Sequence, residues 1–247
     1  MSLIELLWPA FVLAIALVLV HTIFGLEIIR RGVIFTDLAI GQIAAIGMAI
    51  SIAFLEGAYQ NTLTLFFAIL GALLITYATK RIRNIEAFIG LLYALAIASV
   101  MLILAKSTEG AELFSKLSAA DILFTSSDDL VRSVSLYSVV ALLMVFLYPR
   151  LKGLVKELTF FLLLAVTVTS SVQSAGVLVV FSLLIAPAYA GLYQSRWRPF
   201  TFASVFGSIA VVVALFGSYQ LDLPTGYTII FVTVLTSLLF VLAHPKT

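Results

Sequence analysis

Residues Arg30–Gly47 read RRGVIFTDLAIGQIAAIG and form the most informative span of the sequence. The two arginines are followed by an apolar run that continues to Leu55, about the 20 residues that span a bilayer. Inside it stand Asp37 and Gln42, and a carboxylate in a spanning helix costs roughly 2.5–3.5 kcal/mol at the bilayer centre. Such a side chain normally faces protein or water, and the alanines and glycines around it favour close helix packing. The stretch therefore predicts a polar helix inside a membrane bundle that forms part of a translocation pathway.

The whole chain shares this apolar character. Hydrophobic residues make up 63% of its 247 residues and charged residues 11%, whereas soluble domains carry roughly 25% charged residues. The composition predicts an all-α polytopic membrane protein, with residues 1–247 forming a single transmembrane domain. The chain has no cysteine, which excludes disulfides, thiolate metal sites and cysteine nucleophiles. The net charge of +2 gives no indication of a nucleic-acid partner, and none is expected.

Apolar segments of spanning length recur from one end of the sequence to the other. The third and the sixth are short, so we expect eight to nine transmembrane helices. The candidate spans are Leu3–Gly25, Val33–Leu55, Thr62–Ala78, Ile85–Ala105, Leu130–Leu147, Leu154–Ser170, Ala175–Tyr193, Phe200–Tyr219 and Gly226–Ala243.

Basic residues indicate how the helices are oriented. Lys and Arg concentrate in the cytoplasmic loops of membrane proteins, and most of them fall there if the N-terminus lies outside. The cytoplasmic set is then Arg30, Arg31, Lys80, Arg81, Arg83, Arg150, Lys152, Lys156, Arg196, Arg198 and Lys246, and the outer set is Lys106, Lys116 and Arg132. Most acidic residues gather on the outer side, where they either attract cations or a partner or are ordinary solvated loop residues.

Polar residues predict how two of the spans begin. Ser126 is a candidate N-cap of the fifth span and Asn84 of the fourth span, where Glu86 in the first turn complements the helix dipole. Before the fifth span, residues 113–124 are amphipathic enough for a short helix at the membrane surface.

Small and helix-breaking residues indicate where helices pack or bend. Gly90, Ala94 and Ala98 recur at four-residue spacing and predict a seam for a neighbouring helix. The hydroxyl-rich stretch Thr167–Gly176 is either a tight outer turn or a polar patch inside the bundle. Pro187 interrupts the seventh span, and such breaks either line binding sites in transporters or kink structural helices.

Five segments together resemble those of a known family. The family comprises the integral-membrane permease subunits of ABC importers for zinc, manganese and iron, the metal-chelate-type ABC-3 permeases. The segments occur in the family's order and cover most of the chain. They are Arg30–Gly47, Glu86–Gly90, Ala120–Leu123, Val172–Ala190 and Leu221–Gly226.

The resemblance implies a permease in the cytoplasmic membrane of a bacterium or archaeon. Two copies of the chain would form the pathway as a homodimer, cytoplasmic ABC ATPase subunits would drive it, and an extracytoplasmic metal-binding protein would deliver the ion. ATP would bind to the separate ATPase, and no cofactor is expected on this chain. The sequence agrees, because it contains no Walker-type glycine loop followed by Lys and Ser or Thr.

The candidate pathway residues are Asp37, Gly41, Gln42 and Pro187. Many relatives carry a Ser-His pair in the second span, where this chain has Gly41-Gln42 and so lacks the imidazole. A neutral amide is a weaker ligand for zinc-like ions than imidazole or thiolate. We therefore expect a permissive, low-affinity pathway, assign no residue as a metal ligand, and leave zinc, manganese and iron open as cargo.

Each of these polar residues also has a simpler structural explanation. Asp37 lies roughly 9 Å along the helix from the Arg30-Arg31 pair, and it either lines the pathway or pairs with those arginines or Lys80. Gln42 either lines the pathway or forms an inter-helix hydrogen bond, worth about 0.6 kcal/mol in membrane helices. His21 is expected to be a buried neutral histidine rather than a ligand.

The cytoplasmic segment between the fifth and sixth spans is the candidate for coupling to an ATPase. Its charged residues Arg150, Lys152, Lys156 and Glu157 are available for such a contact. Relatives usually carry a longer segment here, so coupling in this chain uses a reduced contact, works differently or is absent.

Enzymatic functions fit the sequence poorly. An intramembrane metalloprotease needs a His-Glu-x-x-His helix, and no Gly-x-Ser-x-Gly motif lies near either histidine. The alternative function is an ATP-independent secondary transporter or channel for cations that uses Asp37 as the coupling carboxylate. It predicts transport that survives removal of any ATPase and fails in Asp37→Asn, whereas a permease requires ATP hydrolysis.

Overall fold

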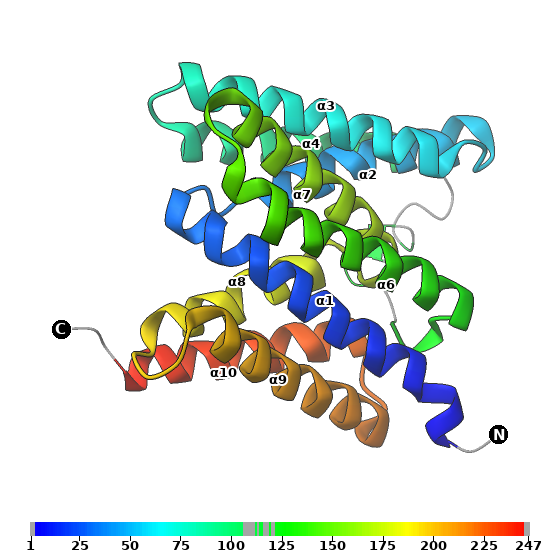
Figure 1. The fold of residues 1–247 in the computed structure, drawn as a ribbon. Coiled ribbons are helices and arrows are strands. Elements are labelled where there is room, and N and C mark those ends of the chain that lie inside the picture. The colour runs from blue at the N-terminus through cyan, green and yellow to red at the C-terminus, as the bar shows by residue number, and fades with distance from the viewer. Residues whose placement is uncertain (1–2, 106–111, 113, 116–118, 120–121, 245–247) are drawn as a thin grey trace.

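The computed structural model describes residues 3–105, 112, 114–115, 119 and 122–244, and within them the chain is a bundle of helices without strands (Figure 1). Three short elements lie among the helices: η1 (Ile122–Phe124), the π-helical turn η2 (Leu143–Leu147) that continues α6, and η3 (Tyr148–Arg150). The long helices are α1 (Leu3–Arg31), α2 (Thr36–Leu55), α3 (Gln60–Arg81), α4 (Ile85–Leu104), α6 (Ser127–Leu142), α7 (Gly153–Ala175), α8 (Val177–Tyr193), α9 (Pro199–Leu221) and α10 (Thr225–Ala243).

The helices match the expected spans, and the all-α membrane bundle is confirmed. Eight of the described helices are long and apolar enough to cross a membrane, and α8, with 17 residues, is shorter. The prediction that the third and sixth spans are the short ones is wrong, because α3 has 22 residues and α7 has 23. Polar residues such as Gln60, Lys80 and Ser171 do not end these helices, since their backbone groups continue the helical hydrogen bonds.

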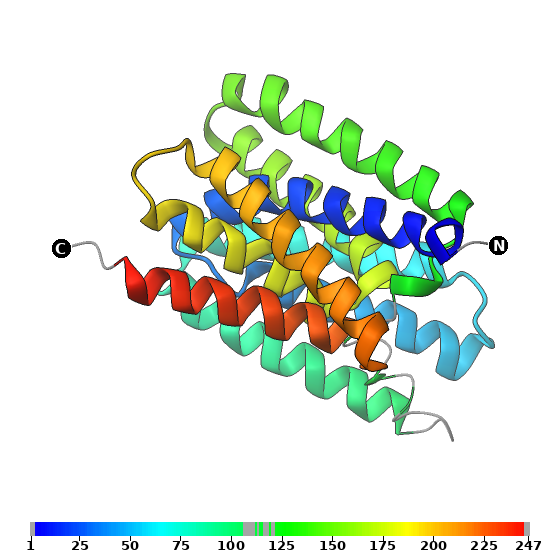
Figure 2. The same cartoon turned by 90° about the horizontal axis from the view of Figure 1, so that it is seen from below.

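Helix α2 lies in the middle of one half of the bundle, enclosed by α3, α4 and α7 (Figures 1 and 2). Its side chains are buried over most of its length. Gly47 lets α3 approach, because a Cβ there would lie 2.4 Å from the carbonyl oxygen of Leu63. Gly71 of α3 in turn receives Ile43, whose Cδ1 would lie 2.9 Å from an added Cβ. The small residues of this region therefore serve close helix packing, as the sequence predicts.

Helix α1 runs across the molecule and joins this half to the other, which consists of α8, α9 and α10 (Figure 1). It packs against α6, α8 and α9. The approach to α8 is closest at Gly25, where an added Cβ would lie only 1.9 Å from the carbonyl oxygen of Leu184. No residue other than glycine fits there without moving the helices apart.

The connections that carry most of the basic residues lie at one end of the bundle, on the left in Figure 1. These are the connections α1–α2, α3–α4, α6–α7 and α8–α9. This arrangement agrees with the expected orientation, in which this end is cytoplasmic. We call it the cytoplasmic end.

The structure places both predicted N-cap residues at the starts of their helices. Ser126 caps α6 as predicted, because its Oγ accepts a hydrogen bond of 3.1 Å from the Asp129 backbone N–H. Asn84 occupies the N-cap position of α4 as predicted, but its side chain makes no capping hydrogen bond. Glu86 instead reaches out of α4, where its Oε1 accepts a 3.2 Å hydrogen bond from the Phe35 backbone N–H. The surface helix expected over 113–124 lies mostly outside the described residues.

Among the described residues, no helix packs on the small-residue seam of α4. Ala94 and Ala98 are exposed, and a Cβ on Gly90 would meet nothing within 4 Å. Helix α4 instead buries a different face against α2, through residues such as Ala96 and Val100. The four-residue spacing correctly predicts a face of small residues. It does not predict what covers that face.

The hydroxyl-rich stretch Thr167–Gly176 is the polar patch inside the bundle rather than a long turn. Helix α7 continues through it to Ala175, because hydroxyls bond back to carbonyls one turn earlier, as from Thr167 Oγ1 to Leu163 O at 2.8 Å. The turn is confined to Gly176, whose φ of 88° is a value that favours glycine.

Candidate functional site

Asp37 stands in the first turn of α2, and its side chain is enclosed by protein. The residue is 1% exposed, and its Oδ1 has no hydrogen-bond partner among the described residues. Of the two alternatives for Asp37, pairing with a nearby basic residue does not occur, because Arg31 binds two other carboxylates and neither Arg30 nor Lys80 forms a salt bridge in the described part of the chain. Asp37 is therefore a carboxylate held without a counter-charge, a costly arrangement that indicates function.

Gly41 shows which way this part of α2 faces. A Cβ on Gly41 would lie between 3.4 and 3.6 Å from the side chains of Val168, Val172 and Val177. Asp37 precedes Gly41 by four residues, so both lie on the same side of α2 about one turn apart. Asp37 therefore faces α7, one turn nearer the cytoplasmic end than Gly41.

Gln42 is buried deeper in the same helix. It is 4% exposed, and its amide forms no hydrogen bond with any described residue, so the inter-helix hydrogen bond, one of the two alternatives for Gln42, does not occur among them. Its carbonyl oxygen and its N–H groups are free to meet a ligand or water. Together with Asp37, it gives α2 two unpaired oxygen-bearing side chains five residues apart.

Pro187 is not brought together with these residues. It lies inside α8 against Gly207 of α9, where an added Cβ would be 2.8 Å from the proline Cγ. The part of α8 that contacts Gly41 is Val177, ten residues earlier and so roughly 15 Å away along the helix. The observed contacts of Pro187 are helix packing.

His21 is fully buried in α1, as expected. Its Nδ1 lies 2.8 Å from the carbonyl oxygen of Leu17, and its Nε2 has no partner among the described residues. No group of three or more His, Asp or Glu side chains that could hold a metal ion occurs in the described ranges.

At the cytoplasmic end lies a cluster that the sequence did not reveal. We call it the Arg31 network (Arg31, Glu27, Tyr148, Glu157 and Phe160). Arg31 donates from Nε to Glu27 Oε1 at 3.0 Å and from Nη1 to Glu157 Oε2 at 2.6 Å. Its Nη2 donates to the Tyr148 hydroxyl, which donates to Glu27 Oε1 at 2.7 Å. The guanidinium carbon lies 4.2 Å from the centre of the Phe160 ring. Only the Arg30-Arg31 pair and Glu157 stood out in the sequence.

The four candidate coupling residues therefore divide into two kinds. Glu157 is held by Arg31, and the Lys156 ammonium lies 4.8 Å from the centre of the Tyr148 ring, so both contact their own chain. Arg150 and Lys152 are exposed, and Arg150 donates a 2.6 Å hydrogen bond to the Phe146 carbonyl oxygen. The latter two remain accessible to a cytoplasmic partner.

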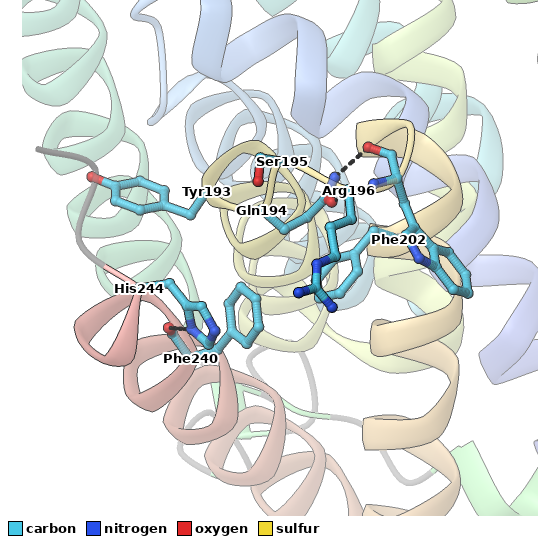
Figure 3. A pocket seen from close by; sticks show the side chains of 8 residues that line it. Tyr193, Gln194, Ser195, Arg196, Phe202, Phe240 and His244 are labelled. Carbon is cyan, nitrogen blue, oxygen red and sulfur yellow. Dashed lines mark hydrogen bonds between the residues drawn. The ribbon is translucent and has the colours of Figure 1, made fainter.

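A second feature of this end is a cavity of about 610 Å³ between the α8–α9 connection and the end of α10 (Figure 3). The connection is stiffened by Gln194, whose Oε1 accepts a 2.7 Å hydrogen bond from the Trp197 backbone N–H. On the opposite wall the His244 ring stacks on Phe240, with ring centres 4.4 Å apart. Trp197 is 56% exposed and Arg196 is also exposed, so this wall is open to a partner.

Comparison with known proteins gives consistent matches along the chain. The sequence model of the ABC 3 transport family matches residues 3–244. The manganese transport system membrane protein MntC of Listeria monocytogenes serovar 1/2a is 26% identical over 97% of this chain and 91% of its own length. The manganese import system permease protein ScaB of Streptococcus parasanguinis is 26% identical over 96% of this chain and 90% of its own length. A chain of the structure of PsaBC from Streptococcus pneumoniae in complex with Fab has a TM-score of 0.81 and 22% identity, over 98% of this chain and 93% of that chain.

Proposed function

Because the chain belongs to the ABC 3 transport family, we propose that it is the membrane permease subunit of an ATP-driven importer of divalent transition-metal ions, with manganese as the cargo. The two relatives above are named as manganese transport proteins, which supports the choice of metal. Family membership also favours ATP-driven transport over the ATP-independent carrier that the sequence alone left open.

The observation that carries the proposal is the pair Asp37 and Gln42 in the enclosed helix α2. Both are buried, Asp37 Oδ1 and the Gln42 amide lack partners among the described residues, and both offer oxygen. Oxygen donors suit manganese, whereas zinc prefers imidazole or thiolate. Two donors bind an ion loosely, as a pathway requires if the ion is to leave again.

The permease would work with partners at both faces. We propose that a separate ABC ATPase binds the cytoplasmic end, at the exposed residues Arg150 and Lys152 and at the α8–α9 connection with Trp197. ATP would bind to that subunit alone, so this chain needs no cofactor of its own. A metal-binding protein on the outer side would deliver the ion.

We further propose that two copies of the chain pair through the outer face of α4. This span is the least covered by its own chain among the eight candidates. Its outward face presents Gly90, Ala94 and Ala98 together with the exposed leucines Leu91, Leu95 and Leu102. The small residues let the backbone of a second helix approach closely, and a second copy would also cover the leucines. Pairing on α4 would place α2, the helix next to it, near the dimer axis.

Co-purification tests the assembly. The chain is expressed with an ABC ATPase and a metal-binding protein from its own organism, and ATP hydrolysis by the detergent-purified complex is measured with and without Mn²⁺. We expect the ATPase to co-purify with the chain and its activity to rise when Mn²⁺ and the binding protein are added. A chain that purifies without any ATPase under these conditions contradicts the proposal.

A further inference from the structure

The Arg31 network joins three segments that are far apart in the sequence: the end of α1, η3 and the beginning of α7. Arg31 and Glu157 are separated by 126 positions. The arginine side chain is only 18% exposed, and its guanidinium is shared among two carboxylates, a hydroxyl and an aromatic face. Removing one partner from this network would leave a poorly solvated charge unpaired. The network therefore holds the three segments firmly.

The network borders a cavity of about 470 Å³ at the cytoplasmic end, between α1, α3, α4 and α7. Arg31, Glu157 and Phe161 form one side of it. The cavity therefore ends at the network on the side of α1 and α7.

Phe161 lines this cavity, and the register of α7 relates its position to that of Asp37. It lies four residues after Glu157 and seven before Val168, so all three occupy the same side of α7. Val168 faces Gly41 of α2, and Asp37 is one turn closer to the cytoplasmic end than Gly41. By this register, Phe161, which is 1% exposed, belongs to the level of α7 between Glu157 and the part that faces Asp37.

We propose that the Arg31 network and Phe161 form the cytoplasmic gate of the pathway, closed in this structure, and that Arg31 must release Glu157 before an ion can pass from Asp37 into the cavity. The proposal rests on the transport function proposed above and adds the element that controls release. Because the exposed residues Arg150 and Lys152 lie at the end of η3 and directly before α7, a partner that moves this connection would act directly on the gate.

The test uses the absence of native cysteine, which makes one introduced thiol the only reactive one. Ala165→Cys places a thiol on the same side of α7, between Phe161 and Val168, at a position that is fully buried. Inside-out vesicles that contain the assembled transporter, without nucleotide or metal, are treated with a membrane-impermeant maleimide from the cytoplasmic side. The labelling rate of the introduced thiol is compared between the native network and Arg31→Met.

We expect Arg31→Met to raise the labelling rate roughly tenfold or more, because loss of a half-buried ion pair shifts the gate toward opening. The matched control is Arg30→Met, which removes the neighbouring, exposed arginine that belongs to none of the network contacts and should leave the rate unchanged. If Arg31→Met does not reach the membrane, Glu157→Gln provides the same comparison.

Equal labelling rates with and without Arg31, or an equal rise in Arg30→Met, would overturn the proposed gate. Labelling needs neither ATP nor metal, so this result is independent of the proposed function. Failure of that function would instead appear as the absence of ATP-dependent Mn²⁺ transport by the unmodified complex.

Discussion

At the scale of single residues, Asp37 is the most informative side chain. It lies enclosed in α2 without a salt bridge among the described residues, although three basic residues are near it in the sequence or at the same end of the bundle. Those basic residues are used elsewhere or remain exposed, so a structural role as an ion-pair partner does not explain it. Its Oδ1 therefore has no partner among the described residues, as the proposed pathway role requires.

Asp37→Asn keeps the shape of the side chain and removes its charge. We expect Mn²⁺ uptake by the complex to fall roughly 10–100-fold, the range seen when polar partners of a metal are altered, with unchanged amounts of protein in the membrane. Asp222→Asn is the matched control, since Asp222 is exposed in the outer turn and asparagine tolerates its positive φ of 50°. Equal uptake by the two variants would remove Asp37 from the pathway.

Gln42 is predicted to influence which metal passes. Gln42→Leu removes both polar groups and should impair Mn²⁺ uptake while the protein still inserts normally. Gln42→His introduces an imidazole, which zinc prefers, so Zn²⁺ should inhibit Mn²⁺ uptake more strongly than in the unmodified complex. Competition assays with both metals measure this, and unchanged uptake and inhibition in both variants would exclude Gln42 as a pathway residue.

At the scale of helices, the sequence predicts the existence of the elements well and their ends less well. Runs of about 20 apolar residues are conspicuous, and all nine expected spans correspond to helices in the described chain. The ends were misjudged where polar residues continue a helix, as between Ser170 and Ala175 of α7. Hydroxyls that bond back to carbonyls one turn earlier make such residues compatible with a helix, and hydropathy does not register this.

Close helix contacts give a prediction at this scale. Gly25→Ala places a Cβ against the Leu184 backbone, so α1 and α8 must separate, and overpacking of this kind costs roughly 1–3 kcal/mol. Gly217→Ala in α9 meets nothing within 4 Å and should be neutral or stabilising by roughly 0.5–1 kcal/mol. Thermal unfolding of the purified variants compares their stabilities. A Gly25→Ala protein as stable as Gly217→Ala would contradict this packing.

At the scale of the whole molecule, the sequence could not supply the contacts between distant segments. The charge of Arg31 was visible, but its pairing with Glu157 and its contact with Tyr148 depend on how α1, η3 and α7 meet in space. For the same reason Glu157 was expected to face a partner, although its own chain holds it. Pro187 was likewise grouped with Asp37 from its helix-breaking chemistry, whereas the fold places it against α9.

The proposed dimer gives a prediction for the assembled protein. In the cysteine-free chain, Ala94→Cys or Ala98→Cys should form a disulfide between two copies when an oxidant is added to membranes. Ile209→Cys, on the outward face of α9 where the residue is 61% exposed, is the control and should remain monomeric on a non-reducing gel. Cross-linking at Ile209→Cys but not at either α4 position would place the second copy on a different face.

The most direct test of the proposed transport function is Mn²⁺ uptake into proteoliposomes that contain this chain, its ABC ATPase and the metal-binding protein. We expect uptake that requires ATP hydrolysis and that stops when the ATPase carries an inactivating substitution. Uptake of equal rate by the chain alone, without ATPase or ATP, would contradict an ATP-driven permease and favour an ATP-independent carrier.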